Sequence, residues 1–276
     1  MAAIDLRKCL NAISDVITNR PMPLREFDQI YMKAADMLLQ VDHVSKKVSN
    51  RSCVFVGDGD AIGLCLVHLH SLQLIDDGPS EVLVLDFDER IVNGINTFAS
   101  NFGISKNIRA ELYNVSDPVP EKYWETFNGF YTNPPFGASN KGKSIEVFLR
   151  RANELICPGA IGCLVLADHP QYQWTQEVLA VTQSFLINNH FIISEMVPEF
   201  HHYHLDDAPD LTSCSIIVKK SFTPNSPYTS LPLSVEELQD FYGEQIPLRV
   251  QYVKDKTGGK YPSKDYELIP IKYKSK

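Results

Sequence analysis

The sequence lacks any run of the roughly 18 apolar residues that a membrane-spanning helix requires. Its N-terminal segment, MAAIDLRKCLNAISDVITNR, contains acidic residues and has no apolar core of the kind found in cleavable signal peptides. We therefore expect a cytoplasmic protein that makes no membrane contact. The chain has six scattered cysteines and no Cys-x-x-Cys pair, which is typical of buried thiols rather than of disulfides or a zinc cluster.

The sequence also has fewer basic than acidic residues. The chain has 34 acidic and 26 basic residues, which gives a formal net charge of -8. Seven lysines and three acids lie in segment 254–276, so the rest of the chain carries -12. A nucleic-acid-binding protein usually has a basic surface, whereas a negative field attracts cationic small molecules. The charge balance therefore favours a polyamine-like partner over nucleic acid, which only a local basic groove would admit.

Continuous apolar strands alternate with helical segments from residue 53 to residue 220. Apolar runs of this kind are typical of strands buried on both faces, so we predict an α/β fold with a mostly parallel, doubly wound sheet. Ligands of such sheets bind at the carboxyl ends of the strands. The predicted strands are CVFVG, EVLVLDFD, a short segment at 109–113, FNGFYT, AIGCLVLAD, FIISEMVPEF and CSIIVKK, and the predicted helices are 61–74, 89–102, 143–156 and 173–188.

Two smaller regions flank this core. Apolar positions recur at helical spacing in 1–19 and 27–46, which predicts a small helical cap. Near the C-terminus, Ser234 and Glu237 form a capping-box pattern for a helix at 234–242, and a Gly-Gly pair predicts the turn of a terminal hairpin. The predicted domains are a helical cap at 1–50, a Rossmann-like catalytic domain at 51–220 and a C-terminal α+β extension at 221–276.

The first candidate site follows the first strand of the core, where the sequence reads Gly57-Asp58-Gly59-Asp60. Glycines let the backbone approach a nucleotide or nucleoside closely. The third glycine of a dinucleotide fingerprint is missing, because Gly63 comes one residue too late. The turn therefore fits an adenosyl ligand without phosphate. The alternative is an ordinary strand-to-helix turn that Asp60 caps.

A second acidic position ends the second strand. A carboxylate at Asp86 could accept hydrogen bonds from both hydroxyls of a ribose. Phe87 follows it and is assigned to the same site. The neighbouring Asp88 could instead be the N-cap of the next helix. An acidic residue one helix after an acidic glycine turn favours binding of a nucleoside.

The most specific signal is Thr132-Asn133-Pro134-Pro135-Phe136-Gly137, which follows the fourth strand. Paired prolines fix an extended backbone and lack N–H groups, so carbonyl oxygens and the Asn133 side chain can face the hydrogens of an amine. Phe136 can face a base or a cation. The alternative is an ordinary proline turn.

Asn133-Pro134-Pro135-Phe136 resembles the amine-binding motif of adenine and cytosine amino-methyltransferases. A longer resemblance, over roughly residues 28–220, is to the branched-chain polyamine synthases, aminopropyltransferases of the class I S-adenosylmethionine-dependent methyltransferase-like superfamily that make N(4)-bis(aminopropyl)spermidine. Acidic residues are usual in that family at positions 59, 114 and 133. The resemblance runs through Asp28-Gln29, the Gly57–Asp60 turn, segment 114–120, FNGFYTNPPF, segment 142–168 and segment 200–203.

The resemblance implies a Rossmann-like class I methyltransferase fold and transfer of an aminopropyl group from decarboxylated S-adenosylmethionine to a polyamine such as spermidine. Asp60 matches the last aspartate of the family's acidic motif and is expected to orient the reacting nitrogen and accept its proton. Asn133, Pro134 and Phe136 are expected beside it. The residues expected at the donor are Gly57, Asp58, Gly59, Asp86, Phe87, Asn114 and Val115.

We also expect an acidic wall for the other cationic nitrogens of a polyamine, which Asp168, Glu199, Asp206 and Asp207 could form. Surface carboxylates are common, so its acids could instead be solvated. His202 and His204 would share a strand face, but no acid or cysteine accompanies them at ligand spacing, so no metal is predicted. The residues assigned to substrate binding are Asp168, Glu199, His202, Tyr203 and Asp206.

Two other functions remain open. An S-adenosylmethionine-dependent N-methyltransferase acting on nucleic acid or protein is the alternative that Asn133 favours. A non-enzymatic protein that binds an adenosyl ligand is the third. The sequence leaves the carboxylation state of the donor and the identity of the acceptor undecided, and it allows a homodimer.

Overall fold

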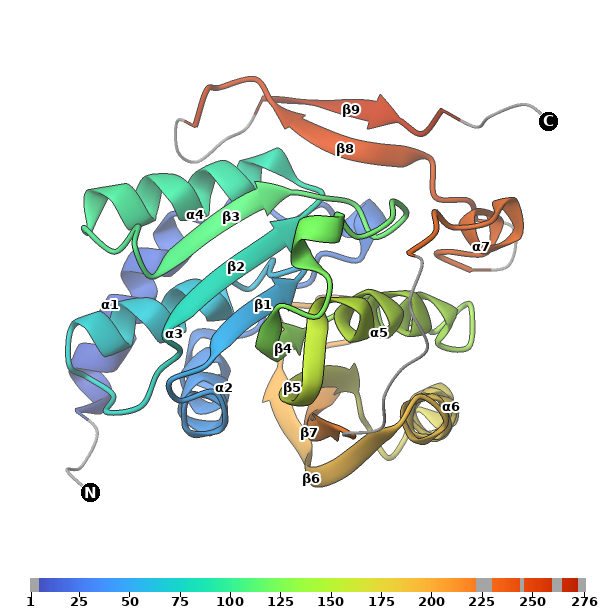
Figure 1. The fold of residues 1–276 in the computed structure, drawn as a ribbon, viewed down its shortest axis with the longest axis horizontal. Helices are drawn as coiled ribbons and strands as arrows, with labels where there is room; N and C mark the ends of the chain where they lie inside the picture. The colour runs from blue at the N-terminus through green and yellow to red at the C-terminus, as the bar shows by residue number, and fades with distance from the viewer. Residues whose placement is uncertain (1–4, 222–229, 244–245, 260–264, 273–276) are drawn as a thin grey trace.

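A seven-stranded sheet runs through the computed structural model, with the strand order β3-β2-β1-β4-β5-β7-β6 (Figure 1). The first five strands are parallel to their neighbours, and β7 lies antiparallel between β5 and β6. This is the mostly parallel sheet of a class I methyltransferase-like fold, as predicted. The structure describes residues 5–221, 230–243, 246–259 and 265–272. The strands are β1 (Ser52–Val56), β2 (Glu81–Asp86), β3 (Ile108–Leu112), β4 (Phe127–Thr132), β5 (Ile156–Ala167), β6 (Phe191–His202) and β7 (Thr212–Lys220).

Helices cover both faces of the sheet. Cys53 and Phe55 of β1 belong to the core under α1 to α4, whereas Val54 and Val56 belong to the core under α5 and α6. Alternate residues of one strand thus enter opposite cores, which explains the continuous apolar runs. In the described part of the chain, no helix has both the length and the apolarity to cross a membrane. The helices are α1 (Leu6–Thr18), α2 (Ala34–Lys47), α3 (Ile62–Ser71), α4 (Glu89–Asn101), α5 (Lys143–Leu155) and α6 (Gln173–Asn188), and a short turn, η2 (Glu121–Tyr123), precedes β4.

The second N-terminal helix begins later than the sequence predicts. Apolar spacing predicted a helix from residue 27, but α2 begins at Ala34 after a single turn, η1 (Arg25–Phe27). The intervening chain is extended because the Met32 N–H donates to the Asp60 carboxylate at 2.7 Å and Met32 pairs with Tyr203 in an isolated bridge. This segment therefore reaches the carboxyl edge of the sheet instead of staying in the cap.

The C-terminal extension contains the helix and the hairpin predicted from the sequence. Helix α7 (Val235–Gln239) carries the capping box of Ser234 and Glu237. Strands β8 (Val250–Asp255) and β9 (Tyr266–Pro270) pair antiparallel and lie beside α4 (Figure 1). The Val253 N–H donates to the Phe87 carbonyl at 3.1 Å, so the hairpin is attached to the loop that follows β2. The domain boundaries at residues 50 and 220 remain a prediction.

Candidate functional site

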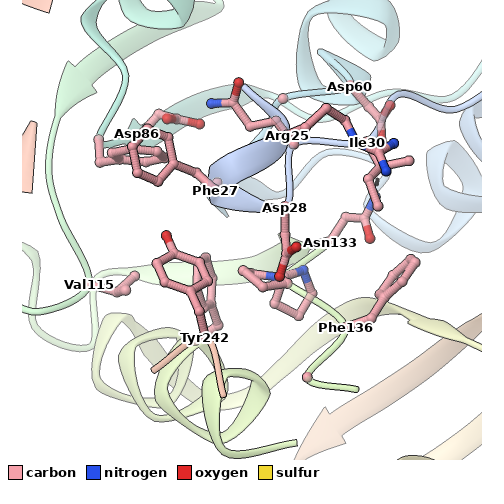
Figure 2. A pocket seen from close by; sticks show the side chains of 18 of the residues that line it. Arg25, Phe27, Asp28, Ile30, Asp60, Asp86, Val115, Asn133, Phe136 and Tyr242 are labelled. Atoms are coloured by element: carbon pink, nitrogen blue, oxygen red, sulfur yellow. Dashed lines mark hydrogen bonds between the residues drawn. The ribbon is translucent and has the colours of Figure 1, made fainter. Parts of the chain in front are cut away.

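A pocket of about 260 Å³ opens at the carboxyl ends of β1, β2, β3 and β4 (Figure 2). Its volume lies just below the roughly 300–1,000 Å³ range of small-molecule sites, so it suits a small ligand. A parallel sheet places its ligand at this edge. All the residues that the sequence assigned to catalysis or to the donor line this pocket, namely Gly57, Asp58, Gly59, Asp60, Asp86, Phe87, Asn114, Val115, Asn133, Pro134 and Phe136.

In the glycine turn after β1, Gly57 allows a left-handed backbone in close contact with a ring, and Asp58 caps the helix that follows. Gly57 has a φ of +71°, and a Cβ atom there would lie 3.2 Å from the Phe148 ring. The Asp58 carboxylate accepts the backbone N–H groups of Ile62 at 2.8 Å and Gly63 at 2.9 Å. The residue that caps α3 is therefore Asp58. The alternative interpretation of the sequence, in which Asp60 caps this helix, is wrong on that point. Burial raises the pKa of the Asp58 carboxyl to about 8, although these hydrogen bonds oppose the shift.

Asp86 and Asp88 have different surroundings. The Asp86 carboxylate is buried in the pocket lining and accepts the N–H groups of Asp58 at 3.1 Å and Asp88 at 2.9 Å. Burial, and then the neighbouring Asp88 charge, raise the pKa of Asp86 to about 7. Asp88 is the N-cap of α4 and pairs with the Arg90 guanidinium at 2.6 Å. Asp88 thus stabilises the start of the helix, and Asp86 is the carboxylate that borders the pocket.

Three aromatic residues from distant parts of the chain meet at the same end of the pocket. The rings of Phe27 and Phe87 are 5.5 Å apart and nearly perpendicular, and the Tyr242 ring lies 6.4 Å from Phe27. All three line the pocket. Edge-to-face packing of this kind forms a rigid apolar wall. The arrangement offers a planar ligand an apolar surface beside the Asp86 carboxylate (Figure 2).

The loop after β3 is held by the C-terminal hairpin. The Asn114 side-chain amide donates to the Gln251 carbonyl at 2.6 Å, and its oxygen accepts the Ser116 N–H at 2.8 Å. Both polar ends of Asn114 thus have partners within the chain. The residue still lines the pocket, so its contribution there is mainly to fix the loop that also carries Val115.

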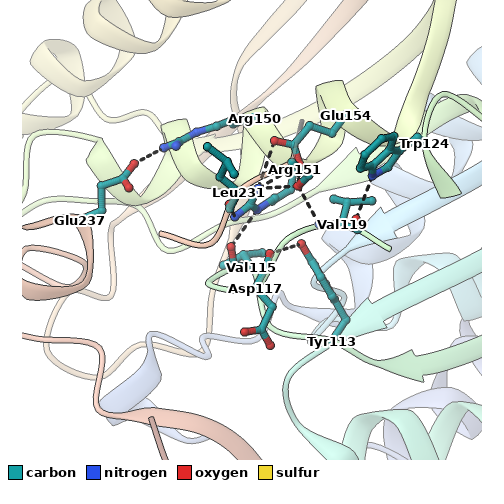
Figure 3. A network of polar contacts seen from close by, with 11 residues as sticks. Tyr113, Val115, Asp117, Val119, Trp124, Arg150, Arg151, Glu154, Leu231 and Glu237 are labelled. Atoms are coloured by element: carbon teal, nitrogen blue, oxygen red, sulfur yellow. Dashed lines mark hydrogen bonds and ion pairs between the residues drawn. The ribbon is translucent and has the colours of Figure 1, made fainter. Parts of the chain in front are cut away.

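A buried arginine supports Val115 from behind (Figure 3). Arg151 is only 1% exposed, and its Nε donates to the Val115 carbonyl at 2.9 Å. Its guanidinium also pairs with Glu154 at 3.0 Å and donates to the Ser230 hydroxyl and the Leu231 carbonyl. A buried charge is tolerated only when it is paired and hydrogen-bonded in this way. The network therefore fixes the loop that carries Val115 at the edge of the pocket.

Asp60 and Asn133 form the opposite end of the pocket. The Asn133 amide donates to the Asp60 carboxylate at 2.9 Å, and the Arg20 guanidinium lies 3.7 Å from the same carboxylate. Burial raises the pKa of Asp60, because the attraction of Arg20 offsets only part of the desolvation cost. Among the described residues, the Asn133 side-chain oxygen is buried and has no hydrogen-bond partner. A ligand N–H group could satisfy that acceptor.

Phe136 borders the pocket beside this pair. Its ring packs edge-on against Tyr203, with the centroids 5.7 Å apart. Tyr203 is buried, and its hydroxyl shares a hydrogen bond of 2.8 Å with Ser213, which also contacts His201. Burial lowers the pKa of His201 to about 3, so the ring is neutral. Tyr203 therefore supports Phe136 from outside the pocket lining.

Most of the predicted acidic wall is not brought to the pocket, as far as the described lining shows. The Asp168 carboxylate accepts the Glu199 N–H at 3.1 Å, His202 lies 3.5 Å from Asp36, and Asp206 is exposed. The pairing of β6 with β7 shifts register between residues 197 and 201, close to Glu199 and His202, and the sequence gives no sign of this shift. In the described ranges, no group of three or more His, Cys, Asp or Glu side chains could hold a metal ion. That the protein uses no metal is still a prediction.

One acid of the predicted wall and two further charged residues line the pocket. Asp28 and Asp207 line the pocket, together with Arg25, which pairs with Asp207 at 3.1 Å. These residues come from η1 and from the β6–β7 loop, far apart in the sequence. Asp28 belongs to the family resemblance and Asp207 to the predicted acidic wall, whereas Arg25 has no local sequence signal.

Comparison with known proteins places the chain in a family. The family model described as the branched-chain polyamine synthase A C-terminal domain matches residues 8–260. The N(4)-bis(aminopropyl)spermidine synthase of Methanocaldococcus jannaschii is 24% identical over 201 residues, which cover 70% of this chain and 52% of that protein. The protein of the same name from Thermus thermophilus is 26% identical over 186 residues, or 67% of this chain and 50% of that one. The chain thus spans about half the length of the curated relatives it matches.

A solved structure of the Thermus thermophilus branched-chain polyamine synthase has the same fold. That protein was crystallised with N4-aminopropylspermidine and 5'-methylthioadenosine, and it matches with a TM-score of 0.69 at 20% identity. The match covers 82% of this chain and 67% of the solved one. At 20% identity this structural match establishes the fold alone. Membership of the family rests on the family model, which matches most of the sequence. The chain therefore belongs to the branched-chain polyamine synthase A C-terminal domain family.

Proposed function

We propose that the protein transfers an aminopropyl group from decarboxylated S-adenosylmethionine to an amine of a polyamine such as spermidine. The observation that carries this proposal is the charge of the pocket. Five aspartates line it, and Arg25 is the one basic residue among its described lining residues. Burial raises the pKa of Asp58 and Asp86 in the empty pocket, but a bound cation favours the ionised form of a nearby carboxyl. This lining therefore suits cations, and both proposed substrates are cations. The five are Asp28, Asp58, Asp60, Asp86 and Asp207.

The donor would lie at the end formed by the Gly57–Gly59 turn, Asp86 and the three aromatic rings. Asp86 would accept the ribose hydroxyls, and Tyr242 and Phe27 would cover the base. S-adenosylmethionine carries a carboxylate that the decarboxylated donor lacks. Among the described lining residues, the only arginine is already paired with Asp207. The pocket therefore supports the decarboxylated donor, because an added carboxylate would face aspartates without a free cationic partner.

The acceptor would lie at the end formed by Asp60, Asn133 and Phe136. A bound sulfonium donor supplies an electrophilic carbon, to which the nitrogen lone pair bonds as the carbon–sulfur bond breaks and a neutral thioether leaves. The buried, unpartnered oxygen of Asn133 would accept an N–H of the amine and orient its lone pair. Asp60 would take the proton released from nitrogen, and its raised pKa makes it a better base than an ordinary aspartate.

An N-methyltransferase is the second candidate, because the Asn133-Pro134-Pro135-Phe136 motif also fits a base amino group. A nucleic-acid substrate would need free basic side chains near the motif. Of the basic residues that follow the motif, Lys143 pairs with Asp240 at 2.7 Å, Arg150 pairs with Glu237 at 2.6 Å, and Arg151 pairs with Glu154 at 3.0 Å. Only the exposed Lys141 forms no ion pair with a residue that the structure describes, and one lysine is too few for a row of phosphates. These pairs support the polyamine over the nucleic acid.

The proposal is tested by incubating the purified protein with spermidine and each donor in turn, followed by mass spectrometry of the amines. We expect an aminopropylated polyamine with decarboxylated S-adenosylmethionine only. A methylated product would support the second candidate. A protein that binds either donor and transfers nothing would be an adenosyl-ligand-binding protein.

A further inference from the structure

The five aspartates of the pocket differ in what already occupies their oxygens. Asp58 and Asp86 each accept two backbone N–H groups. Asp60 accepts a backbone N–H and the Asn133 amide, and Asp207 pairs with an arginine. The carboxylate of Asp28 forms no hydrogen bond or ion pair with any residue that the structure describes. It is therefore the lining carboxylate with both oxygens available to a ligand.

Asp28 also has an unusual backbone. Its φ of 56° lies in the left-handed region, which non-glycine residues rarely adopt, although aspartate and asparagine tolerate it better than others. Such conformations occur often at functional sites, where the surrounding structure holds them. Desolvation by the pocket walls raises the pKa of the Asp28 carboxyl, and the Arg25 charge opposes that shift. The side chain nevertheless keeps access to solvent, so a soluble ligand can reach it.

The segment that carries Asp28 is anchored on both sides. The Gln29 side chain accepts the Leu24 N–H at 2.8 Å and donates to the Asp88 carboxylate at 3.1 Å. Further along, the Met32 N–H donates to Asp60. These bonds hold the backbone without using the Asp28 carboxylate. A fixed charged group loses less conformational entropy when it binds a ligand than a mobile one does.

Asp28 lies where the two ends of the pocket meet. Figure 2 shows its side chain between Tyr242, at the donor end, and Asn133, at the acceptor end. The closeness to Tyr242 is also electrostatic, because the Asp28 charge adds to burial in raising the pKa of the tyrosine hydroxyl. A polyamine whose reacting nitrogen lies beside Asn133 would extend its next nitrogen along this part of the pocket.

We propose that Asp28 binds a protonated nitrogen of the acceptor next to the reacting one, and so selects amines that carry more than one positive charge. This inference rests on the proposed aminopropyl transfer. Spermidine carries about three positive charges near neutral pH. A monoamine, once its only nitrogen has lost its proton to react, offers no cation to Asp28.

The test compares Asp28→Asn with Glu26→Gln. Asparagine has the shape of aspartate and tolerates the left-handed backbone, so the fold should persist. Glu26 lies two residues away on the same turn, is exposed, and is outside the pocket lining, so its replacement removes one negative charge from the same region. Binding of spermidine is measured by calorimetry, and KM is measured for spermidine and for propylamine.

We expect Asp28→Asn to weaken spermidine binding about tenfold, the loss typical of one charged hydrogen bond, and to leave donor affinity and the KM for propylamine unchanged. Glu26→Gln should change spermidine binding less than about twofold, as expected for an exposed charge. The inference is overturned if the two variants bind spermidine equally, if donor affinity falls as much as spermidine affinity, or if the wild-type protein binds no spermidine. Because calorimetry requires no turnover, spermidine binding that depends on Asp28 without any transfer would refute the proposed reaction and leave this site standing.

Discussion

The side-chain amide of Asn133 donates to the carboxylate of Asp60 at 2.9 Å, and this bond joins the turn after β1 to the proline motif after β4. The two strands are parallel neighbours, so their carboxyl ends lie side by side. Arg20 and the Met32 N–H complete the surroundings of the carboxylate. Asp60 is thus held in one orientation at the end of the pocket proposed for the acceptor.

Replacing Asp60 by asparagine should lower the turnover rate by at least about a hundredfold, the usual contribution of a positioned base. Donor affinity should change far less, because Asp60 lies at the end of the pocket away from Asp86. Steady-state kinetics with saturating donor, together with calorimetry of donor binding, separate the two effects. If turnover rate and donor affinity fall by the same factor, Asp60 acts on the donor and not on the acceptor.

Replacing Asp86 by alanine should weaken donor binding at least about tenfold, or 1.4 kcal/mol, because the carboxylate proposed to accept the ribose hydroxyls is lost. The substitution also frees the N–H groups of Asp58 and Asp88, so circular dichroism is needed to check the fold. Calorimetry with 5'-methylthioadenosine measures the binding affinity of the nucleoside part of the donor alone. Unchanged affinity in a folded variant would remove Asp86 from the donor site.

The stability of the ligand-free protein should fall as pH rises from about 4 to about 8. Burial raises the pKa of Asp58 to about 8 and of Asp86 to about 7, from the ordinary value of 3.8. Between these limits the folded state binds more protons than the unfolded chain, so stabilisation present at low pH is lost as these groups ionise. Urea denaturation across this range measures the change, and Asp86→Asn should flatten it. If the slope of the variant equals that of the wild type, Asp86 is not one of the groups responsible.

Replacing Arg151 by methionine should destabilise the fold by about 3–5 kcal/mol, because the Glu154 carboxylate would remain buried without its partner. Its neighbour Arg150 provides the matched control. The Arg150 side chain is 42% exposed and pairs with Glu237, so its replacement by methionine should cost at most about 1 kcal/mol. Urea denaturation of both variants gives the comparison. Similar losses would mean that the buried network does not support the Val115 loop.

Much of the sheet and of the pocket could be predicted because the signals are local. The strand EVLVLDFD ends at the expected carboxylate, Asp86, and helix α6 has the predicted bounds of 173–188. A parallel sheet then brings the loops after β1, β2 and β4 to one edge. The predicted donor and catalytic residues therefore meet in one pocket, and their individual roles remain proposals.

The remaining parts depend on contacts between distant segments. Helical spacing extended α2 back to residue 27, but the bond between Met32 and Asp60 keeps the chain extended there. Tyr242 reaches the pocket only because the C-terminal extension packs against Phe27. On the β6–β7 loop both Asp206 and Asp207 were candidates for the acidic wall and Asp206 was assigned to the substrate, whereas it is Asp207 that lines the pocket. Neither periodicity nor a motif distinguishes two adjacent aspartates.

The most direct test of the proposed activity is a competition in one tube. The protein is given equal concentrations of decarboxylated S-adenosylmethionine and S-adenosylmethionine, with spermidine and a DNA oligonucleotide as acceptors, and all products are identified by mass spectrometry. The acidic pocket predicts that an aminopropyl group appears on spermidine, that the oligonucleotide stays unmodified, and that the rate falls as added salt screens the attraction. A methyl group on either acceptor, with no aminopropylated spermidine, would contradict the account.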